Sequence, residues 1–190
     1  MIELLDAEER IIDERYIEYK GFWPRLGAVI IDVIIMWVVS AAFNVIAINS
    51  HEAELTAILS ALATIATYLY YPLMEGASGA TLGKKALKMV IVDNRFEKIN
   101  YRHAFMRNIF RLFSGALVTG LILYNAFFPL QTSGDFSFWS NGMIAIVMII
   151  LLTGIFDIVV FIGSEKHQAL HDIIAGTYVV GSERFGSSSF

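Results

Sequence analysis

The chain has 190 residues, a net charge of −4 and a mean hydropathy of +0.61, and 56% of its residues are hydrophobic. A composition this apolar excludes an ordinary soluble domain and indicates a membrane protein. The sequence contains no cysteine, which excludes both a disulfide framework and thiolate chemistry.

The first 24 residues are an acidic, amphipathic segment. Seven of the eighteen Asp and Glu residues of the chain lie within its first twenty positions. A signal peptide begins with basic residues followed by a short apolar run, so this segment is not one. We expect either a solvated helical arm or a helix whose apolar side, including Ile12 and Ile17, lies against the bilayer or the middle loop.

Four apolar segments follow, at residues 26–48, 55–74, 114–130 and 143–163. A hydrocarbon core about 30 Å thick requires roughly 20 apolar residues in a crossing helix. Three of the segments meet this length, and the third along the chain is shorter. The sequence therefore predicts an all-α membrane protein with four transmembrane helices. Residues 25–180 form one membrane domain, and residues 181–190 form a flexible tail.

All fourteen Lys and Arg residues lie outside the two connections, 49–54 and 131–142, that join the first two and the last two segments. Positive charge beside membrane helices is retained on the cytoplasmic side. We therefore expect both termini and the middle loop, residues 75–113, in the cytoplasm. The predicted location is the cytoplasmic (cell) membrane, which the chain crosses several times.

The middle loop is basic and has a structure of its own. Residues 88–93 and 176–181 are short and β-branched, and unpaired strand edges are unfavourable, so we predict that they form a small two-stranded sheet. Residues 102–113 have apolar side chains at helical spacing with arginines on another face. This pattern predicts an amphipathic helix in the plane of the interface or, alternatively, a cytoplasmic extension of the third membrane helix.

Membrane lipids are the partner that the basic loop favours, because its basic residues alternate with apolar ones; nucleic acid is not expected. The residues expected to contact anionic headgroups are Lys84, Lys85, Arg107 and Arg111.

Three acids lie in the apolar segments or at their edge: Asp32, Asp157 and Glu75. An ionisable residue in a membrane helix costs about 2.5–3.5 kcal/mol on insertion scales, so each is a functional candidate. Asp32 and Asp157 lie at comparable depth and can face one cavity, where two carboxylates do not both stay ionised at low cost. The alternative is that Arg25 or neighbouring polar groups neutralise each acid in a purely structural role.

His167 and His171 are four residues apart, and Asp172 follows directly. This is metal-ligand spacing on a helix, but a metal site also needs a third ligand and a dry shell. A histidine pair at a helix end is the favoured interpretation. We predict no metal and no cofactor, and because no hydrolase-like arrangement of side chains is present, no enzyme.

Three blocks of this chain resemble the RDD family of small membrane proteins, named for one Arg and two Asp. They are YKGFWPRLGAVIID at 19–32, TLGK at 81–84 with VIVD at 90–93 and Arg107-Asn108, and QALHDIIAGTYVV at 168–180. The resemblance places the three family residues at Arg25, Asp32 and Asp172. One departure is Asp93-Asn94, where the family usually has Asp-Gly.

The resemblance implies transport, with sodium–proton antiport suggested for some members and an adaptor role for others. Our leading hypothesis is exchange of a monovalent cation, sodium, for protons at Asp32, with Arg25 tuning that carboxylate and Asp172 anchoring the cytoplasmic end. Four short helices enclose little space, so we expect a homo-oligomer. The alternative is a non-transporting scaffold or lipid-binding module in which Arg25, Asp32 and Asp172 form a structural clamp.

Overall fold

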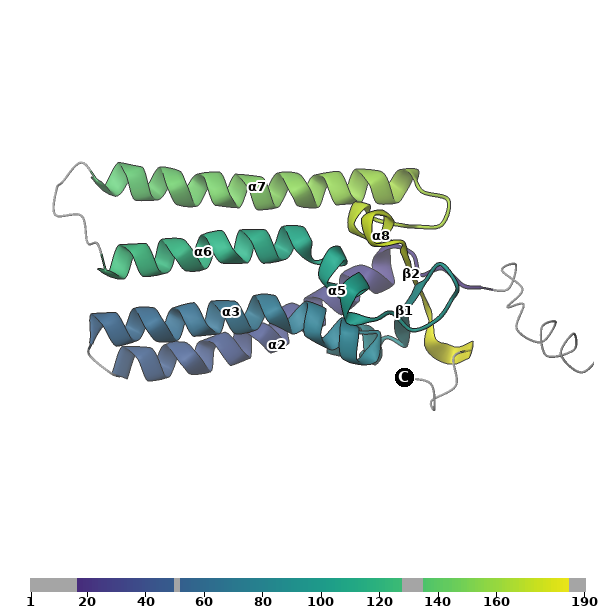
Figure 1. The fold of residues 1–190 in the computed structure, drawn as a ribbon, viewed down its shortest axis with the longest axis horizontal. Helices are drawn as coiled ribbons and strands as arrows, with labels where there is room; N and C mark the ends of the chain where they lie inside the picture. Colours follow the sequence, from purple (N-terminus) through teal and green to yellow (C-terminus); the bar gives the residue numbers. More distant parts are fainter. Residues whose placement is uncertain (1–16, 50–51, 128–134, 185–190) are drawn as a thin grey trace, which may run out of the picture.

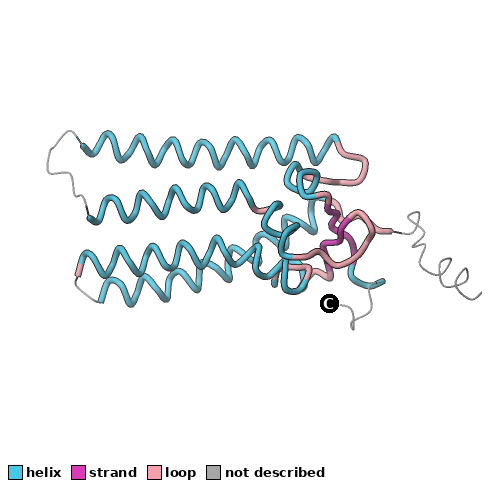
Figure 2. The backbone as a smooth tube through the Cα atoms, viewed as in Figure 1, coloured by secondary structure: helices cyan, strands magenta, loops and turns pink. Residues whose placement is uncertain are grey.

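Four long helices lie side by side in the computed structural model, which describes residues 17–49, 52–127 and 135–184 (Figure 1). They are α2 (Phe22–Asn49), α3 (Ala53–Ser78), α6 (Ile109–Phe127) and α7 (Asp135–Gly163). The short elements gather at one end of the long helices, where Figure 2 shows the strands. These are α4 (Leu82–Ala86), β1 (Met89–Asp93), α5 (Tyr101–Arg107), α8 (Leu170–Ala175), β2 (Thr177–Gly181) and the 3-10 turn η2 (Ser182–Arg184). We call them, with their connections, the cap.

Two of the long helices, α2 and α3, are long and apolar enough to cross a membrane over Phe22–Ile46 and Glu54–Ser78. The bent pair α5 and α6 adds a third candidate span, and among the described residues Gly154–Gly163 of α7 is a shorter apolar helix. The mostly helical membrane fold predicted from hydropathy is therefore confirmed. The four-span topology stays a prediction.

The long helices differ from the predicted segments mainly at their ends. Helix α2 begins at Phe22, so Arg25 lies within its first turn. Helix α3 continues to Ser78 because Gly79 closes it in the left-handed conformation, with a φ of 69° and its N–H bonded to the carbonyl of Glu75. Glu75 is thus inside the helix, on the turn that faces the cap.

The predicted two-stranded sheet is confirmed. Strands β1 and β2 pair antiparallel, with Ile91 opposite Val179. One face packs on a buried cluster that includes Ala28 of α2, and the other on a cluster that includes Phe96. Because both faces are covered, the sheet can be apolar along nearly its whole length, and it joins the middle loop to the C-terminal segment.

The N-terminal segment joins the same sheet. Lys20 donates its backbone N–H to Val179, Gly181 donates to Glu18, and Tyr19 forms an isolated bridge with Val180. Ile17 packs against the sheet in an extended chain rather than on the side of a helix. The remainder of the predicted amphipathic segment, residues 1–16, lies outside the described residues.

The region 102–113 is two helices. Helix α5 ends at Arg107, Asn108 caps it, and α6 starts at Ile109 after a bend of 66°. The prediction of one continuous helix over this region, whether amphipathic or a cytoplasmic extension of the third membrane helix, is therefore wrong. The reason is the side chain of Asn108, which bonds to the carbonyl of Ala104 and to Glu75 of α3 and so fixes the break against a neighbouring helix.

Close packing of α3 on α6 gives a direct test of this arrangement. A Cβ added at Gly115 would lie 2.4 Å from the ring of Tyr68, whereas one added at Gly120 of the same helix meets no atom within 4 Å. We expect Gly115→Ala to destabilise the detergent-solubilised protein by about 1–3 kcal/mol, the usual cost of overpacking. Gly120→Ala, the matched control, should melt like the wild type. Equal melting of the two variants would contradict the packing.

Candidate functional site

A buried cluster of charged side chains lies where the cap meets the long helices, and Asp172 is at its centre. Arg25 of α2 donates from Nη1 to Oδ2 of Asp172 at 2.6 Å. Arg107 of α5 places Nη2 2.8 Å from Oδ1 of the same carboxylate. The side chain of Asp172 is fully buried, so both contacts form away from water. Three elements, α2, α5 and α8, are thereby joined through one carboxylate.

The charge of Asp172 is kept by its surroundings. Burial alone raises the pKa of a carboxyl group, but the positive charges of Arg107, His171 and Arg25 outweigh it and hold the pKa of Asp172 well below its usual range. The N–H of Ala169 also donates to Oδ2, at the start of α8. Asp172 is therefore an ionised anchor at neutral pH, which suits a structural contact better than a proton-exchanging one.

Glu75 is a second buried carboxylate in the same cluster. It forms an ion pair with Lys84 and accepts a hydrogen bond from Asn108 at 2.8 Å, and Nε of Arg107 lies 3.5 Å away. Burial lowers the pKa of Lys84, and the charge of Glu75 opposes that shift. Arg107 thus lies between two acids from α3 and α8, and its Nη1 also donates to Thr177 at the start of β2.

These contacts correct two of the predicted headgroup residues. The side chain of Arg107 is only 2% exposed and that of Lys84 13% exposed, because each is turned inward to a buried acid. Neither can lie against lipid headgroups. Lys85 and Arg111 are exposed, and the guanidinium of Arg111 lies 3.9 Å from the centre of the Tyr71 ring. Only these two of the four retain the surface position that headgroup contact requires.

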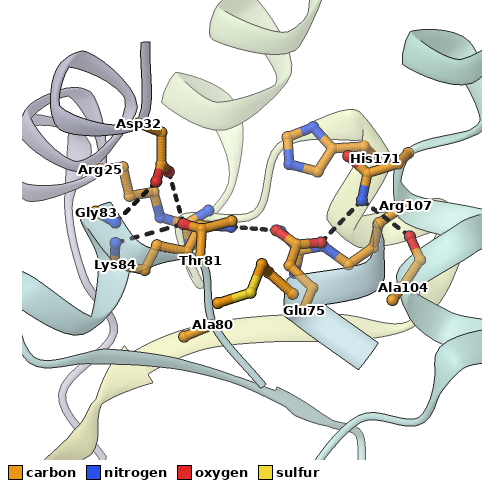
Figure 3. Close-up of polar contacts among 12 residues, drawn as sticks. Arg25, Asp32, Glu75, Ala80, Thr81, Gly83, Lys84, Ala104, Arg107 and His171 are labelled. Atoms are coloured by element: carbon orange, nitrogen blue, oxygen red, sulfur yellow. Dashed lines mark hydrogen bonds and ion pairs between the residues drawn. The ribbon is translucent and has the colours of Figure 1, made fainter. Parts of the chain in front are cut away.

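Asp32 occupies a separate, uncharged environment on α2. Its Oδ1 accepts hydrogen bonds from the Tyr70 hydroxyl and the Gly83 N–H, both at 2.8 Å, and its Oδ2 accepts from the Thr81 hydroxyl at 2.6 Å. Figure 3 shows Asp32 directed at Thr81 and Gly83, with Lys84 and Glu75 beyond them. Asp32 therefore fastens the start of α4 to the middle of α2.

Gly83 is the residue that allows this approach. A Cβ at that position would lie 2.1 Å from the carbonyl oxygen of Ala28 and 2.9 Å from Cγ of Asp32. The side chain of Thr81 accepts a hydrogen bond from the N–H of Lys84 while donating to Asp32, so it caps α4 and joins it to α2 at once. The TLGK block is thus a contact surface for Asp32.

Asp157 and Asp32 have different partners. Asp157 of α7 lies 2.9 Å from Nδ1 of His171. His167 precedes α8, has a positive φ of 50°, and stacks on Phe161, so the two histidines do not share a helix face. Among the described residues, no group of three or more His, Asp or Glu side chains is arranged to hold a metal ion.

Sequence reasoning missed Tyr70, Thr81 and the inward position of Arg107. Thr81 and Arg107 stand in the blocks on which the family resemblance rests, but a block does not reveal which side chain contacts which. Tyr70 carries no signal at all, because an aromatic residue in an apolar helix normally indicates core or lipid contact. Its hydroxyl nevertheless donates to Asp32 and accepts from the Leu82 N–H.

Two neighbouring arginines test the inward position of Arg107. We expect Arg107→Gln to destabilise the protein by about 3–5 kcal/mol, because it leaves the buried charge of Asp172 only partly compensated. Arg111→Gln, in the first turn of α6 beyond the break, should cost less than about 1 kcal/mol, as for an exposed group. Thermal melting in detergent measures both. The reverse order of melting temperatures would indicate that Arg107 is a surface residue.

Comparison with known proteins agrees with this geometry. The model of the RDD family matches residues 19–176, a range that contains Arg25, Asp32 and Asp172 and most of the cap. No curated protein and no solved structure matches the chain. The resemblance first noted in three separate blocks thus extends over most of the sequence. With its apolar helices and this match, the chain is a multi-pass integral membrane protein that belongs to the RDD family.

Proposed function

We propose that this protein is a non-transporting membrane scaffold in which Arg25, Asp32 and Asp172 clamp a cytoplasmic cap onto the membrane helices. The observation that carries the proposal is the engagement of both acids by partners inside the fold. Two guanidinium groups hold Asp172, and three uncharged donors hold Asp32. The contacts of Arg25, Thr81 and Gly83 join the cap to α2, that of Arg107 joins two parts of the cap, and that of Tyr70 joins α3 to α2.

The proposed orientation has four spans with the cap and both termini in the cytoplasm of the cell. Every Lys and Arg that the structure describes lies in the cap, in the segment before α2, or in the first turn of α2 or α6. All of these places are at the same end of the long helices (Figure 1). Basic residues concentrated on one side favour the cytoplasmic face. Lys85 and Arg111 would contact lipid headgroups there.

No catalytic step is assigned to the scaffold, and its proposed partners are membrane lipids and proteins on the cytoplasmic side. The buried charges give the cap a fixed position relative to the membrane, so that a surface on it is presented in one orientation. A buried ionic network is a weak source of net stability but can specify one arrangement over others.

Asp32→Asn tests the clamp. The amide nitrogen of Asn cannot accept the hydrogen bonds that now reach the carboxylate, and a hydrogen bond to a charged group contributes about 1.5–3 kcal/mol. We therefore expect a clear fall in the melting temperature of the purified protein. Glu183→Gln, which alters an exposed acid of η2, is the control and should melt like the wild type. A fully stable Asp32→Asn variant would refute the clamp.

Exchange of sodium for protons at Asp32 is the second candidate. The observation that favours it is that Asp32 is buried on a membrane-spanning helix with neutral donors, and no ion pair to it occurs among the described residues. Such a carboxylate can be neutralised by a proton or a monovalent cation without breaking a salt bridge. A transport path would require a homo-oligomer, because four helices enclose little space.

Flux measurements separate the two candidates. In vesicles containing the purified protein, an imposed sodium gradient should produce no change in internal pH if the protein is a scaffold. If sodium drives proton flux in the wild type and the flux disappears in a folded Asp32→Asn variant, the scaffold proposal is wrong and the protein is an exchanger. Glu183→Gln serves again as the matched control, since its charge lies on the surface.

A further inference from the structure

Arg111 lies in the first turn of α6, directly after the bend that separates this helix from α5 (Figure 1). Its side chain is exposed, and among the described residues it forms no ion pair. Its two side-chain contacts are a hydrogen bond from Nη1 to Oδ1 of Asn108, at 2.9 Å, and the Tyr71 ring, whose centre is 3.9 Å from Cζ. Arg107 and Lys84, in contrast, are each directed at a buried acid.

The buried acid behind Arg111 is Glu75, and other bases already compensate it. Asn108 connects the two residues, because its side chain accepts a hydrogen bond from Arg111 and donates one to Glu75. Glu75 forms its ion pair with Lys84, and Nε of Arg107 lies 3.5 Å from its carboxylate. Arg111 therefore presents a positive charge at the surface of the protein without an acidic partner of its own.

Tyr71 and Asn108 hold the guanidinium group of Arg111 in one orientation. The Tyr71 ring covers one face of the group and Asn108 takes Nη1, so the edge formed by Nε and Nη2 is left for a ligand. A guanidinium edge is a planar fork of two N–H groups that matches two oxygens of a phosphate. Because the side chain is already ordered, binding costs less conformational entropy. The geometry therefore suits a phosphate group.

The depth of Arg111 matches the level of lipid headgroups. Helix α3 has 26 residues and is about 39 Å long, whereas the hydrocarbon core of a bilayer is about 30 Å thick. The ends of α3 therefore project into the headgroup layers. Tyr71 precedes the last residue of α3, Ser78, by seven positions, or about 10 Å. The guanidinium over its ring is thus near the boundary between acyl chains and headgroups, from which a long side chain reaches phosphate.

An exposed apolar strip continues from this position along α6, away from the cap. It consists of Phe110, Phe113 and Leu117, which are 50%, 64% and 41% exposed. Spacings of three and four residues place them on one side of the helix. Such a strip accommodates the acyl chains of a lipid whose phosphate is at Arg111. A free phosphate ion would gain nothing from it, so the occupant is a phospholipid.

We propose that Arg111 binds the phosphate of an anionic phospholipid of the cytoplasmic leaflet, with the acyl chains along Phe110, Phe113 and Leu117. The inference rests on the proposed function, from which it takes the orientation and the headgroup contact, and it adds the class of lipid and the geometry. An anionic lipid is favoured because a zwitterionic one carries its own ammonium group, which opposes attraction to a cation. The bound lipid would lie beside the bend at which the cap begins.

Native mass spectrometry of the full chain in detergent tests the site. The protein is mixed with phosphatidylglycerol or with phosphatidylcholine of identical acyl chains, and the wild type should retain the former in preference. Arg111→Gln should weaken that retention about fivefold, which corresponds to about 1 kcal/mol for one basic residue at a membrane surface. Arg95→Gln, the same substitution at an exposed base in the turn after β1, is the matched control and should bind like the wild type.

Two substitutions of Tyr71 test the orientation of the guanidinium. Tyr71→Phe keeps the ring and should retain phosphatidylglycerol like the wild type, whereas Tyr71→Leu removes the ring and should weaken retention. Inorganic phosphate, offered without lipid, should give no adduct that depends on Arg111. The proposal is overturned if the wild type retains both lipids equally, if Arg111→Gln and Arg95→Gln behave alike, if the two Tyr71 variants do, or if free phosphate binds at Arg111.

Failure of this inference can be told from failure of the clamp. Arg111 takes no part in the contacts of Asp32 and Asp172, so the melting of Asp32→Asn reports on the clamp alone. If Asp32→Asn is destabilised and Arg111→Gln retains the lipid, only the lipid site is wrong. If Asp32→Asn is fully stable, the clamp is wrong, and the comparison of Arg111→Gln with Arg95→Gln still decides whether the lipid site exists.

Discussion

The ion pairs of Asp172 with Arg25 and Arg107 are the contacts on which the junction of cap and membrane helices depends. Asp172 and Arg25 are 147 residues apart in the sequence, yet Nη1 and Oδ2 are 2.6 Å apart. Removing water from three charges is costly, and their mutual attraction repays that cost only when the geometry is complete. A cap displaced from α2 would separate Arg25 from Asp172 and leave that carboxylate with Arg107 alone. These ion pairs therefore favour this arrangement over other arrangements more than they add to the free energy of unfolding.

The rest of the junction extends from this centre. Arg107, which pairs with Asp172, also lies beside Glu75, and Glu75 forms an ion pair with Lys84 of α4. Thr81, three residues before Lys84, donates a hydrogen bond to Asp32 and so links this part of the cap to α2. The three blocks that carry the family resemblance are thus parts of one contact surface. They are distant in the sequence because they belong to different elements. These elements meet at one end of the bundle, which is the cytoplasmic end in the proposed orientation.

The sequence predicted the class of the fold and the pairing of β1 with β2, because hydropathy and β-branched runs are local signals. It also singled out Asp32 and Glu75, because ionisable residues are rare in apolar helices, and Arg25 and Asp172, because the family resemblance places its named residues there. It could not show that Arg107 faces inward, since helical spacing places that residue on a basic face and its acidic partner is on another element. The break at Asn108 was missed for the same reason: the side chain that fixes it is Glu75, on α3.

The central claim, that Arg25 and Asp172 act as one clamp, is tested most directly by a double-mutant cycle. The melting of the wild type, Arg25→Gln, Asp172→Asn and the double variant is compared in detergent. If the two side chains form a buried pair, the double variant is less destabilised than the sum of the single ones, with a coupling of about 0.5–3 kcal/mol. Strictly additive effects would contradict the account, because they would mean that neither charge depends on the other.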